Sequence, residues 1–222
     1  MEVKYFINEK NIKSQFGVYV AASEGVLDLP KIKEFTTQDW NEYHGTLVDL
    51  SAPRLQNREI TLDCWINADS QLAFIQRLTS FYNEFLRSGF KRLRIEIDNV
   101  PPLIYDTYLS DNIKITKQWT EGSQQGKFKL KLTEPNPQKR IFKFTATGRH
   151  LTCTLRILTQ MAVIITWGDN ERTEEVIAGN WYHATHTYDH AGEYYISISG
   201  MINQLQTAFD SNDNIEQIWR IL

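Results

Sequence analysis

The side chains best suited to metal chemistry are three histidines near the C-terminal end, His183, His186 and His190. Imidazole nitrogens are common zinc ligands, and three of them would leave one coordination position open. The spacing argues against such a site, because residues three apart on a strand point to opposite faces. No glutamate lies between His183 and His186 to act as a base. We therefore expect no metal site and no cofactor.

Carboxylates offer a second kind of chemistry. Asp169 stands in the stretch Trp-Gly-Asp-Asn, where a carboxylate and turn carbonyls could hold calcium. A Gly-Asp pair between two strands is, however, typical of a hairpin turn. The other acidic residues are scattered singly, so no pair has a recognisable glycosidase spacing. Because nucleophile-elbow, P-loop and dinucleotide-binding motifs are also missing, we expect a protein that is not an enzyme.

Composition and charge narrow the function classes further. Of 222 residues, 41% are hydrophobic and 23% charged, and the net charge is −3, as in ordinary globular proteins. This charge offers no basic field for nucleic acid. No apolar run reaches the roughly 18 residues of a membrane span, and the charged N-terminus lacks a signal-peptide core. We therefore expect synthesis and folding in the cytoplasm, without a nucleic-acid or membrane partner.

Most of the chain alternates apolar and polar residues with a period of two, the pattern of half-buried strands. The stretch 126–132 is the clearest case, with three apolar residues on one face and Lys127, Lys129 and Lys131 on the other. Such a lysine row is typical of a solvated face or of a guarded edge strand. It is also a candidate interface.

Two segments have the helical period instead. Residues 70–88 carry an apolar stripe between a capping residue, Asp69 or Ser70, and Gly89, which predicts a helix of about five turns laid across a sheet. Residues 213–222 combine a capping-box pattern with a second apolar stripe, which predicts a short C-terminal helix.

The stretch 133–140, with two prolines among charged residues, is typical of a domain boundary. Residues 1–140 hold 19 Lys and Arg against 18 Asp and Glu, whereas residues 141–222 hold 5 against 9. We expect one domain over residues 1–138 and a second over residues 139–222. The expected fold class is mainly β (α+β): an antiparallel β-sandwich with one long amphipathic helix, followed by a small β-sandwich.

One long segment, residues 27–59, has few periodic runs and contains Trp40 and Tyr43. Loops of this length tend to be functional or interface-forming. Exposed aromatic side chains there would suit a protein–protein contact, and buried ones would pin the loop to the body. We take Trp40 and Tyr43 as candidate interface residues.

The C-terminal part resembles the PKD-type (polycystic kidney disease repeat) β-sandwich family. The matching positions are Trp167, Gly168, Asp169, His186, Tyr188, Gly192 and Tyr194, and Asn170 replaces the usual second glycine of the turn. The resemblance implies a small Ig-like sandwich that serves as a spacer or interaction module. Within it, Trp167 and Tyr188 would fill the core, while Gly168 and Gly192 would let the backbone turn.

Residues 1–138 resemble the N-terminal domain of phage distal tail (Dit) proteins. The matching positions are Gly17, Leu29, Pro30, Asp39, Trp40, Gly45, Arg58 and Ile60, with the helix following in the expected order. The resemblance implies a structural protein of a phage tail or of a prophage-derived, tail-like particle. Such proteins are baseplate hub subunits that assemble in the bacterial host cytoplasm into homo-oligomeric rings, usually hexamers, between the tail tube and the tail-tip proteins of the virion.

Ring formation needs two different patches that meet head to tail, and we expect the loop 36–57 and the row Lys127–Lys131 to supply them. Two alternatives stay open. A cell-surface adhesion or carbohydrate-binding module would use exposed, coplanar aromatics from the set Trp181, Tyr182, Tyr194 and Tyr195. An enzyme of unrecognised type would show a deep pocket with convergent ionisable groups.

Overall fold

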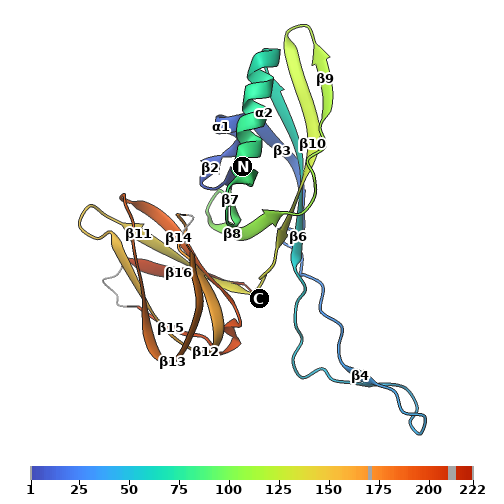
Figure 1. The fold of residues 1–222 in the computed structure, drawn as a ribbon, viewed down its shortest axis with the longest axis vertical. Coiled ribbons are helices and arrows are strands. Elements are labelled where there is room, and N and C mark those ends of the chain that lie inside the picture. The colour runs from blue at the N-terminus through green and yellow to red at the C-terminus, as the bar shows by residue number, and fades with distance from the viewer. Residues whose placement is uncertain (1, 170–171, 210–213, 222) are drawn as a thin grey trace.

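The computed structural model describes residues 2–169, 172–209 and 214–221. The chain is mostly β and forms two large antiparallel sheets, one from its first 134 residues and one from the residues after 138, together with a separate two-stranded pair at residues 37–48 (Figure 1). The first sheet has the order β2-β1-β7-β8-β10-β6-β3, with β9 beside β10, and the second has the order β13-β12-β14-β11-β16, with β15 beside β12. The division of the chain into two domains at residue 138 stays a prediction.

The elements of the first part are β1 (Val3–Ile7), β2 (Lys10–Asn11), α1 (Ile12–Phe16), β3 (Val18–Glu24), β4 (Thr37–Gln38), β5 (Leu47–Val48), β6 (Arg58–Ala68), α2 (Gln71–Leu86), β7 (Lys91–Ile97), β8 (Val100–Leu109), β9 (Thr116–Thr120) and β10 (Ser123–Glu134). Those of the second are β11 (Lys139–Ala146), β12 (Thr152–Thr166), β13 (Arg172–Thr187), β14 (Gly192–Gly200), the 3-10 helix η1 (Ile202–Gln204), β15 (Gln206–Ala208) and β16 (Ile215–Ile221).

The two-residue period of the sequence sets the register of the first sheet. β6 and β10 pair along their whole lengths, from Gln124 opposite Ala68 to Glu134 opposite Arg58. Alternate residues on both strands are buried, because neighbouring side chains of a strand point to opposite faces. One face of the sheet is therefore apolar and needs a cover.

Helix α2 supplies that cover. It spans Gln71–Leu86, where a helix over about 70–88 was expected, and the Ser70 hydroxyl accepts a hydrogen bond from the Ala73 amide at 3.2 Å. Phe74 and Phe81 on its inner face are almost fully buried. The Phe81 ring packs against Phe16, Phe85 and Phe128, so the helix closes the first core.

The end of α2 is held differently from the expectation. The helix ends before an extended residue, Arg87, and Gly89 with its positive φ lies two residues further on. The Lys91 ammonium donates hydrogen bonds to the carbonyls of Arg87, Ser88 and Gly89. A buried lysine thus binds the carbonyl groups just after the helix, which a pattern search for a capping glycine does not reveal.

The second sheet encloses a core of its own. Its largest buried side chains include Trp167, Tyr188, Phe142 and Phe144. The long strands β12 and β13 pair with several shifts of register, and such bulges bend and twist strands. The sheet can therefore curve around its core instead of staying flat (Figure 1).

The expected C-terminal helix over 213–222 is wrong. Residues Ile215–Ile221 form β16, which pairs antiparallel with β11 from Ile215 opposite Phe144 to Ile221 opposite Lys139. β-Branched isoleucines favour strands, and β11 offers its free edge to a partner. Asp213, the expected capping residue, and Leu222, the last residue of the predicted stripe, lie outside the described residues.

Within the described ranges, none of the helices has the length and apolar character needed to cross a membrane.

Candidate interaction surfaces and the junction between the sheets

Residues 27–57, here called the arm, leave the body as a long, narrow hairpin (Figure 1). Its two sides are joined by few backbone hydrogen bonds, such as those from the Lys33 amide to the Arg54 carbonyl and from the Gln56 amide to the Lys31 carbonyl, both 2.7 Å long. Nearer the tip, β4 and β5 pair over two residues each. The arm is therefore ordered by sparse local pairing, and none of its side chains belongs to the hydrophobic cores found among the described residues.

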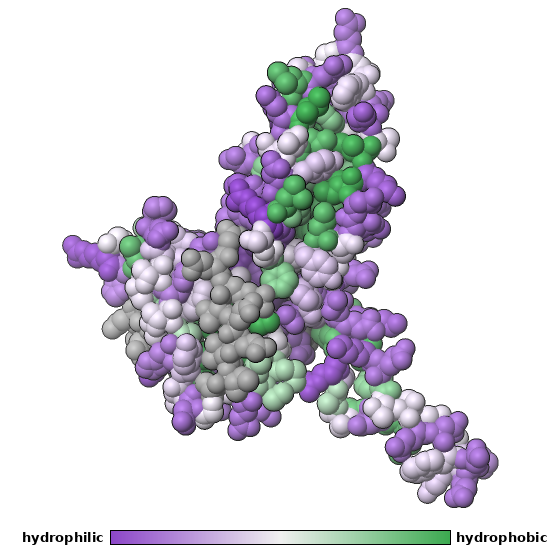
Figure 2. All heavy atoms as spheres, in the orientation of Figure 1, coloured by the Kyte–Doolittle hydropathy of each residue, from purple (hydrophilic) through white to green (hydrophobic). Residues whose placement is uncertain are grey.

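The arm carries many exposed apolar side chains. They are Leu27, Leu29, Ile32, Trp40, Tyr43, Leu47, Val48 and Leu50. Figure 2 shows apolar and polar side chains interleaved along it. Trp40 and Tyr43 are 51% and 69% exposed, and their ring centroids lie 5.6 Å apart. Both predicted interface aromatics are thus on the surface, as a contact role requires.

The root of the arm is fixed firmly. The Arg58 guanidinium donates hydrogen bonds to the carbonyls of Gly25, Val26 and Asp28, and the Tyr105 hydroxyl donates to the Val26 carbonyl at 2.6 Å. Arg58 is 6% exposed. The direction in which the arm leaves the body is therefore set by buried groups.

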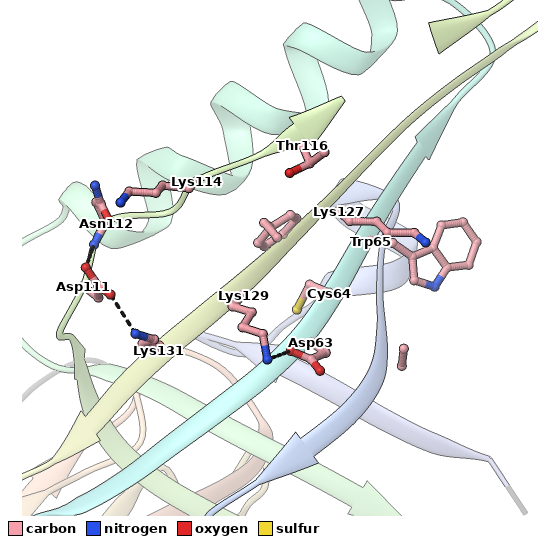
Figure 3. Close-up of a pocket in the computed structure, with 12 residues that line it drawn as sticks. Asp63, Cys64, Trp65, Asp111, Asn112, Lys114, Thr116, Lys127, Lys129 and Lys131 are labelled. Atoms are coloured by element: carbon pink, nitrogen blue, oxygen red, sulfur yellow. Dashed lines mark hydrogen bonds and ion pairs between the residues drawn. The ribbon is translucent and has the colours of Figure 1, made fainter. Parts of the chain in front are cut away.

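The lysine row lies on the face of the first sheet opposite α2. Lys127, Lys129 and Lys131 are exposed, while the alternate residues between them are buried. β10 pairs with β6 on one side and with β8 and β9 on the other, so the interpretation of the row as an edge-strand guard is wrong. The row instead borders an open groove of about 610 Å³ (Figure 3).

Two lysines of the row are already paired. Lys129 Nζ lies 3.0 Å from Asp63 Oδ1, and Lys131 Nζ lies 2.9 Å from Asp111 Oδ2 (Figure 3). Their hydrogen bonds raise the pKa of Lys129 and lower the pKa of Asp111. In the groove as described, Lys127 makes no ion pair, so it carries the unneutralised charge of the row.

The groove also contains Lys114, which the sequence analysis missed. It stands in the connection between β8 and β9, where no period or motif singles it out. Across residues 2–169, 172–209 and 214–221 it forms no hydrogen bond or ion pair, and its charge acts on Asp111 only through space. Sheet pairing brings this loop beside β10, which sequence spacing could not show.

A different kind of surface joins the two sheets. We call its polar part the junction cluster: Arg58, Arg92, Asp106, Glu134, Lys139 and Ser197. Arg92 Nε lies 2.8 Å from Asp106 Oδ1, and its Nη2 lies 3.2 Å from Asp106 Oδ2. The same guanidinium donates to the Tyr195 carbonyl of β14, and the Ser197 hydroxyl donates to Asp106. Arg92 and Asp106 of the first sheet thus bind the second sheet directly.

Burial by itself would raise the pKa of Asp106. The Arg92 guanidinium and the Ser197 hydroxyl outweigh that effect and hold the pKa of this carboxyl below its ordinary value. Charge-assisted, two-pronged contacts of this kind are the strong ones among protein hydrogen bonds. Asp106 therefore stays ionised in the folded chain.

The other end of the cluster centres on Glu134. Its carboxylate accepts hydrogen bonds from Arg58 Nε at 3.2 Å and from the Lys139 ammonium. Glu134 and Lys139 are each 1% exposed. Burial raises the pKa of Glu134 and lowers that of Lys139. Because Arg58 also holds the root of the arm, the same carboxylate connects the arm to the first residue of β11.

Apolar contacts complete the junction. Ile104 of β8 packs with Ile141 of β11 and Tyr195 of β14, and Ile218 and Trp219 of β16 cover them. The Trp219 indole donates a hydrogen bond to the Pro102 carbonyl at 2.9 Å. The two sheets are thus held together by buried charge and by apolar packing.

The residues that resembled a PKD-type turn serve the second core. The Tyr188 hydroxyl donates to the Trp167 carbonyl at 2.8 Å, and the His186 ring stacks on Trp167. His186 Nε2 lies 2.5 Å from Asp169 Oδ2. His183 and His190 are exposed. Over the part of the chain that the structure describes, no three His, Cys, Asp or Glu side chains converge as metal ligands.

The four aromatics of the carbohydrate hypothesis are not equivalent. Trp181 and Tyr182 are 50% and 44% exposed on β13. Tyr195 is buried in the junction, and Tyr194 stacks on Tyr188 with centroids 3.8 Å apart. The structure therefore leaves two of the four on the surface.

No family model matches the sequence, and no curated protein matches it either. Among solved structures, the chain is similar to the crystal structure of the phage SPP1 Dit protein, described as a paradigm of the hub adsorption apparatus in phages that infect Gram-positive bacteria. The two chains are 10% identical with a TM-score of 0.43, and the match covers 90% of this chain and 98% of the other.

Proposed function

We propose that this chain is a structural assembly protein of a phage tail or tail-like particle. In this proposal it is a hub ring subunit that links the tail tube to the tail-tip proteins. The observation that carries the proposal is the arm, which places Trp40 and Tyr43 in solvent on a hairpin outside the hydrophobic cores of the described residues. Its natural partners are further copies of the chain and other tail proteins.

The arm lacks extended backbone pairing of its own. An isolated two-stranded hairpin is at best marginally stable in water, and the arm has only short stretches of pairing. Exposed tryptophan and tyrosine are the residue types most enriched at interface hot spots. A rigidly rooted arm with such residues at its tip is suited to reach a neighbouring subunit. A protein that functions as a monomer does not need such an arm.

The likeness to SPP1 Dit has too low a TM-score to support this assignment. The sequence pattern of residues 1–138 supports it, since Asp39, Trp40 and Gly45 of the Dit-like pattern all lie on the arm. The pattern around Trp167 likewise supports a PKD-like spacer for the second part. In this proposal the junction cluster holds that spacer at a fixed angle to the ring.

The proposal is tested by the self-association of the purified full chain. We expect sedimentation velocity and electron microscopy to show closed rings at micromolar concentration. Trp40→Ala should weaken association at least tenfold, because removal of a central aromatic anchor costs about 2 kcal/mol or more. Tyr182→Ala, a similarly exposed aromatic on the second sheet, is the matched control and should leave association unchanged. A wild-type chain that stays monomeric at high concentration would overturn the proposal.

A further inference from the structure

We propose that the groove beside the lysine row receives the arm tip, residues 37–48, of a second copy of the chain. This inference deepens the proposed function and rests on it. It assigns the acceptor surface and the groups that recognise the tip: Asp39 and Glu42 of one copy pair with Lys114 and Lys127 of the next.

The tip carries acidic side chains that have no ion-pair partner among the described residues. Between residues 37 and 48 the sequence holds Asp39 and Glu42 but no lysine or arginine. Both carboxylates are exposed, and neither forms a hydrogen bond or an ion pair with any residue of the described ranges. They flank Trp40 and lie beside Tyr43, so charge and apolar surface occur together on the tip.

The groove offers the complementary charges. Lys129 and Lys131 are neutralised by Asp63 and Asp111, which leaves two ammonium groups, those of Lys114 and Lys127, without an ion-pair partner in the described groove. In Figure 3 Lys127 extends toward Trp65, while Lys114 lies at the other side, next to Asn112. Two unpaired cations thus border a space that an acidic, aromatic segment could enter.

The lining of the groove also suits aromatic side chains. Trp65 is the aromatic side chain on the groove face of the sheet, and its ring is stacked on Tyr19 with centroids 4.2 Å apart. A volume of about 610 Å³ lies within the range of roughly 300–1,000 Å³ typical of binding sites. The pair Trp40 and Tyr43 can therefore bury apolar area there while the flanking carboxylates reach the lysines.

The tip must come from another copy. The arm root is held by Arg58 and Tyr105, and the arm extends away from the end of the first sheet where β9 and the start of β10 lie (Figure 1). Arm and groove are different patches of one chain, so their contact is head to tail. Such contacts close into a ring when the rotation between copies permits.

A charge exchange tests the assignment in the full chain. The variants D39K/E42K and K114E/K127E should each weaken self-association at least tenfold, because like charges then oppose each other across the contact. A chain that carries all four substitutions should recover association to within about threefold of wild type. The control K4E/R149E lowers the net charge by the same amount as K114E/K127E, at exposed positions elsewhere, and should have no effect. Circular dichroism verifies the fold of each variant.

The outcomes separate this inference from the proposed function. If Trp40→Ala weakens association but K114E/K127E behaves like K4E/R149E, the tip binds elsewhere and the groove assignment is wrong. If the fourfold variant fails to recover, the pairing is likewise wrong. If neither Trp40→Ala nor any charge variant changes association, the proposed function itself fails.

Discussion

The arm and the junction cluster place their polar and aromatic side chains in opposite environments, one in solvent and the other in the interior. In the junction, six charged or polar side chains, five of them buried and Asp106 half-buried, are bonded in two groups of three. At the tip of the arm, aromatic side chains lie in solvent, and the carboxylates of Asp39 and Glu42 have no partner in the described chain. The difference separates the groups that are paired within this chain from the groups that we propose are paired by a second copy.

Buried charge is tolerated only when it is paired and hydrogen-bonded. The junction meets this condition within one chain, so it fixes the angle between the sheets without outside help. In the arm, the carboxylates of Asp39 and Glu42 have no partner among the described residues, and the aromatic side chains are exposed. Large exposed apolar surfaces mark interaction sites. Stability and assembly should therefore respond to different residues, which the following substitutions test.

Glu134→Ala should have the largest effect on stability. It leaves the buried ammonium of Lys139 and the Arg58 guanidinium without their carboxylate, and breaking a buried pair in this way costs about 3–5 kcal/mol. Urea unfolding measures the loss. The control Lys129→Ala breaks an exposed pair and should leave the midpoint unchanged. Equal effects of the two variants would contradict the picture of a junction held by charge.

Asp106→Asn should lower the free energy of unfolding by about 1.5–3 kcal/mol at neutral pH, the usual contribution of hydrogen bonds to charged groups. The pKa of Asp106 is lowered in the folded chain. Its stabilisation is therefore complete above its ordinary pKa of 3.8 and is lost as the pH falls through the lower folded value.

The gap between wild type and Asp106→Asn in unfolding free energy should accordingly shrink as the pH falls below about 4. Burial raises the pKa of Glu134, so that carboxyl acts in the opposite direction, and only the difference between the two proteins isolates Asp106. A gap that stays constant from pH 7 to pH 3 would contradict the assignment.

Trp219→Phe should lower the free energy of unfolding by about 1 kcal/mol, because it removes the hydrogen bond to the Pro102 carbonyl and keeps most of the apolar packing. Thermal unfolding of the full chain measures it. Since this bond ties β16 to the first sheet, an unchanged melting temperature would indicate that β16 contributes nothing to the junction.

Trp40→Ala should have the smallest effect on folding, less than about 0.5 kcal/mol under conditions where the chain is monomeric, as for exposed residues generally. The same substitution should weaken self-association at least tenfold. Urea unfolding and sedimentation on the same samples measure the two effects. A large loss of stability would mean that the arm packs on its own chain.

The sequence predicted the elements that depend on local period. The alternation in 126–132 gave β10 and its lysine face, and the stripe over 70–88 gave α2. The tail was misread, because a spacing of three and four between Ile215, Ile218 and Trp219 fits a helix, whereas pairing with β11 decides the outcome. Tertiary context overrides such weak local preference.

The groove and the junction depended on pairing across long stretches of chain. Trp40, Tyr43 and Lys127 were proposed as interface residues from residue type and position, but nothing local distinguishes Lys114 from other exposed lysines. Glu134 and Lys139 looked like ordinary charges of a linker. Only the meeting of the two sheets shows that both are buried, since burial is set by partners far away in the sequence.

Hydrogen exchange at two protein concentrations tests the central claim most directly. Amides of the arm, residues 31–56, should exchange quickly in dilute, monomeric protein and become strongly protected when the chain self-associates. Amides of the junction strands β7, β8 and β14 should be protected equally in both. Arm amides whose exchange does not change on association, or a chain that never associates, would contradict it.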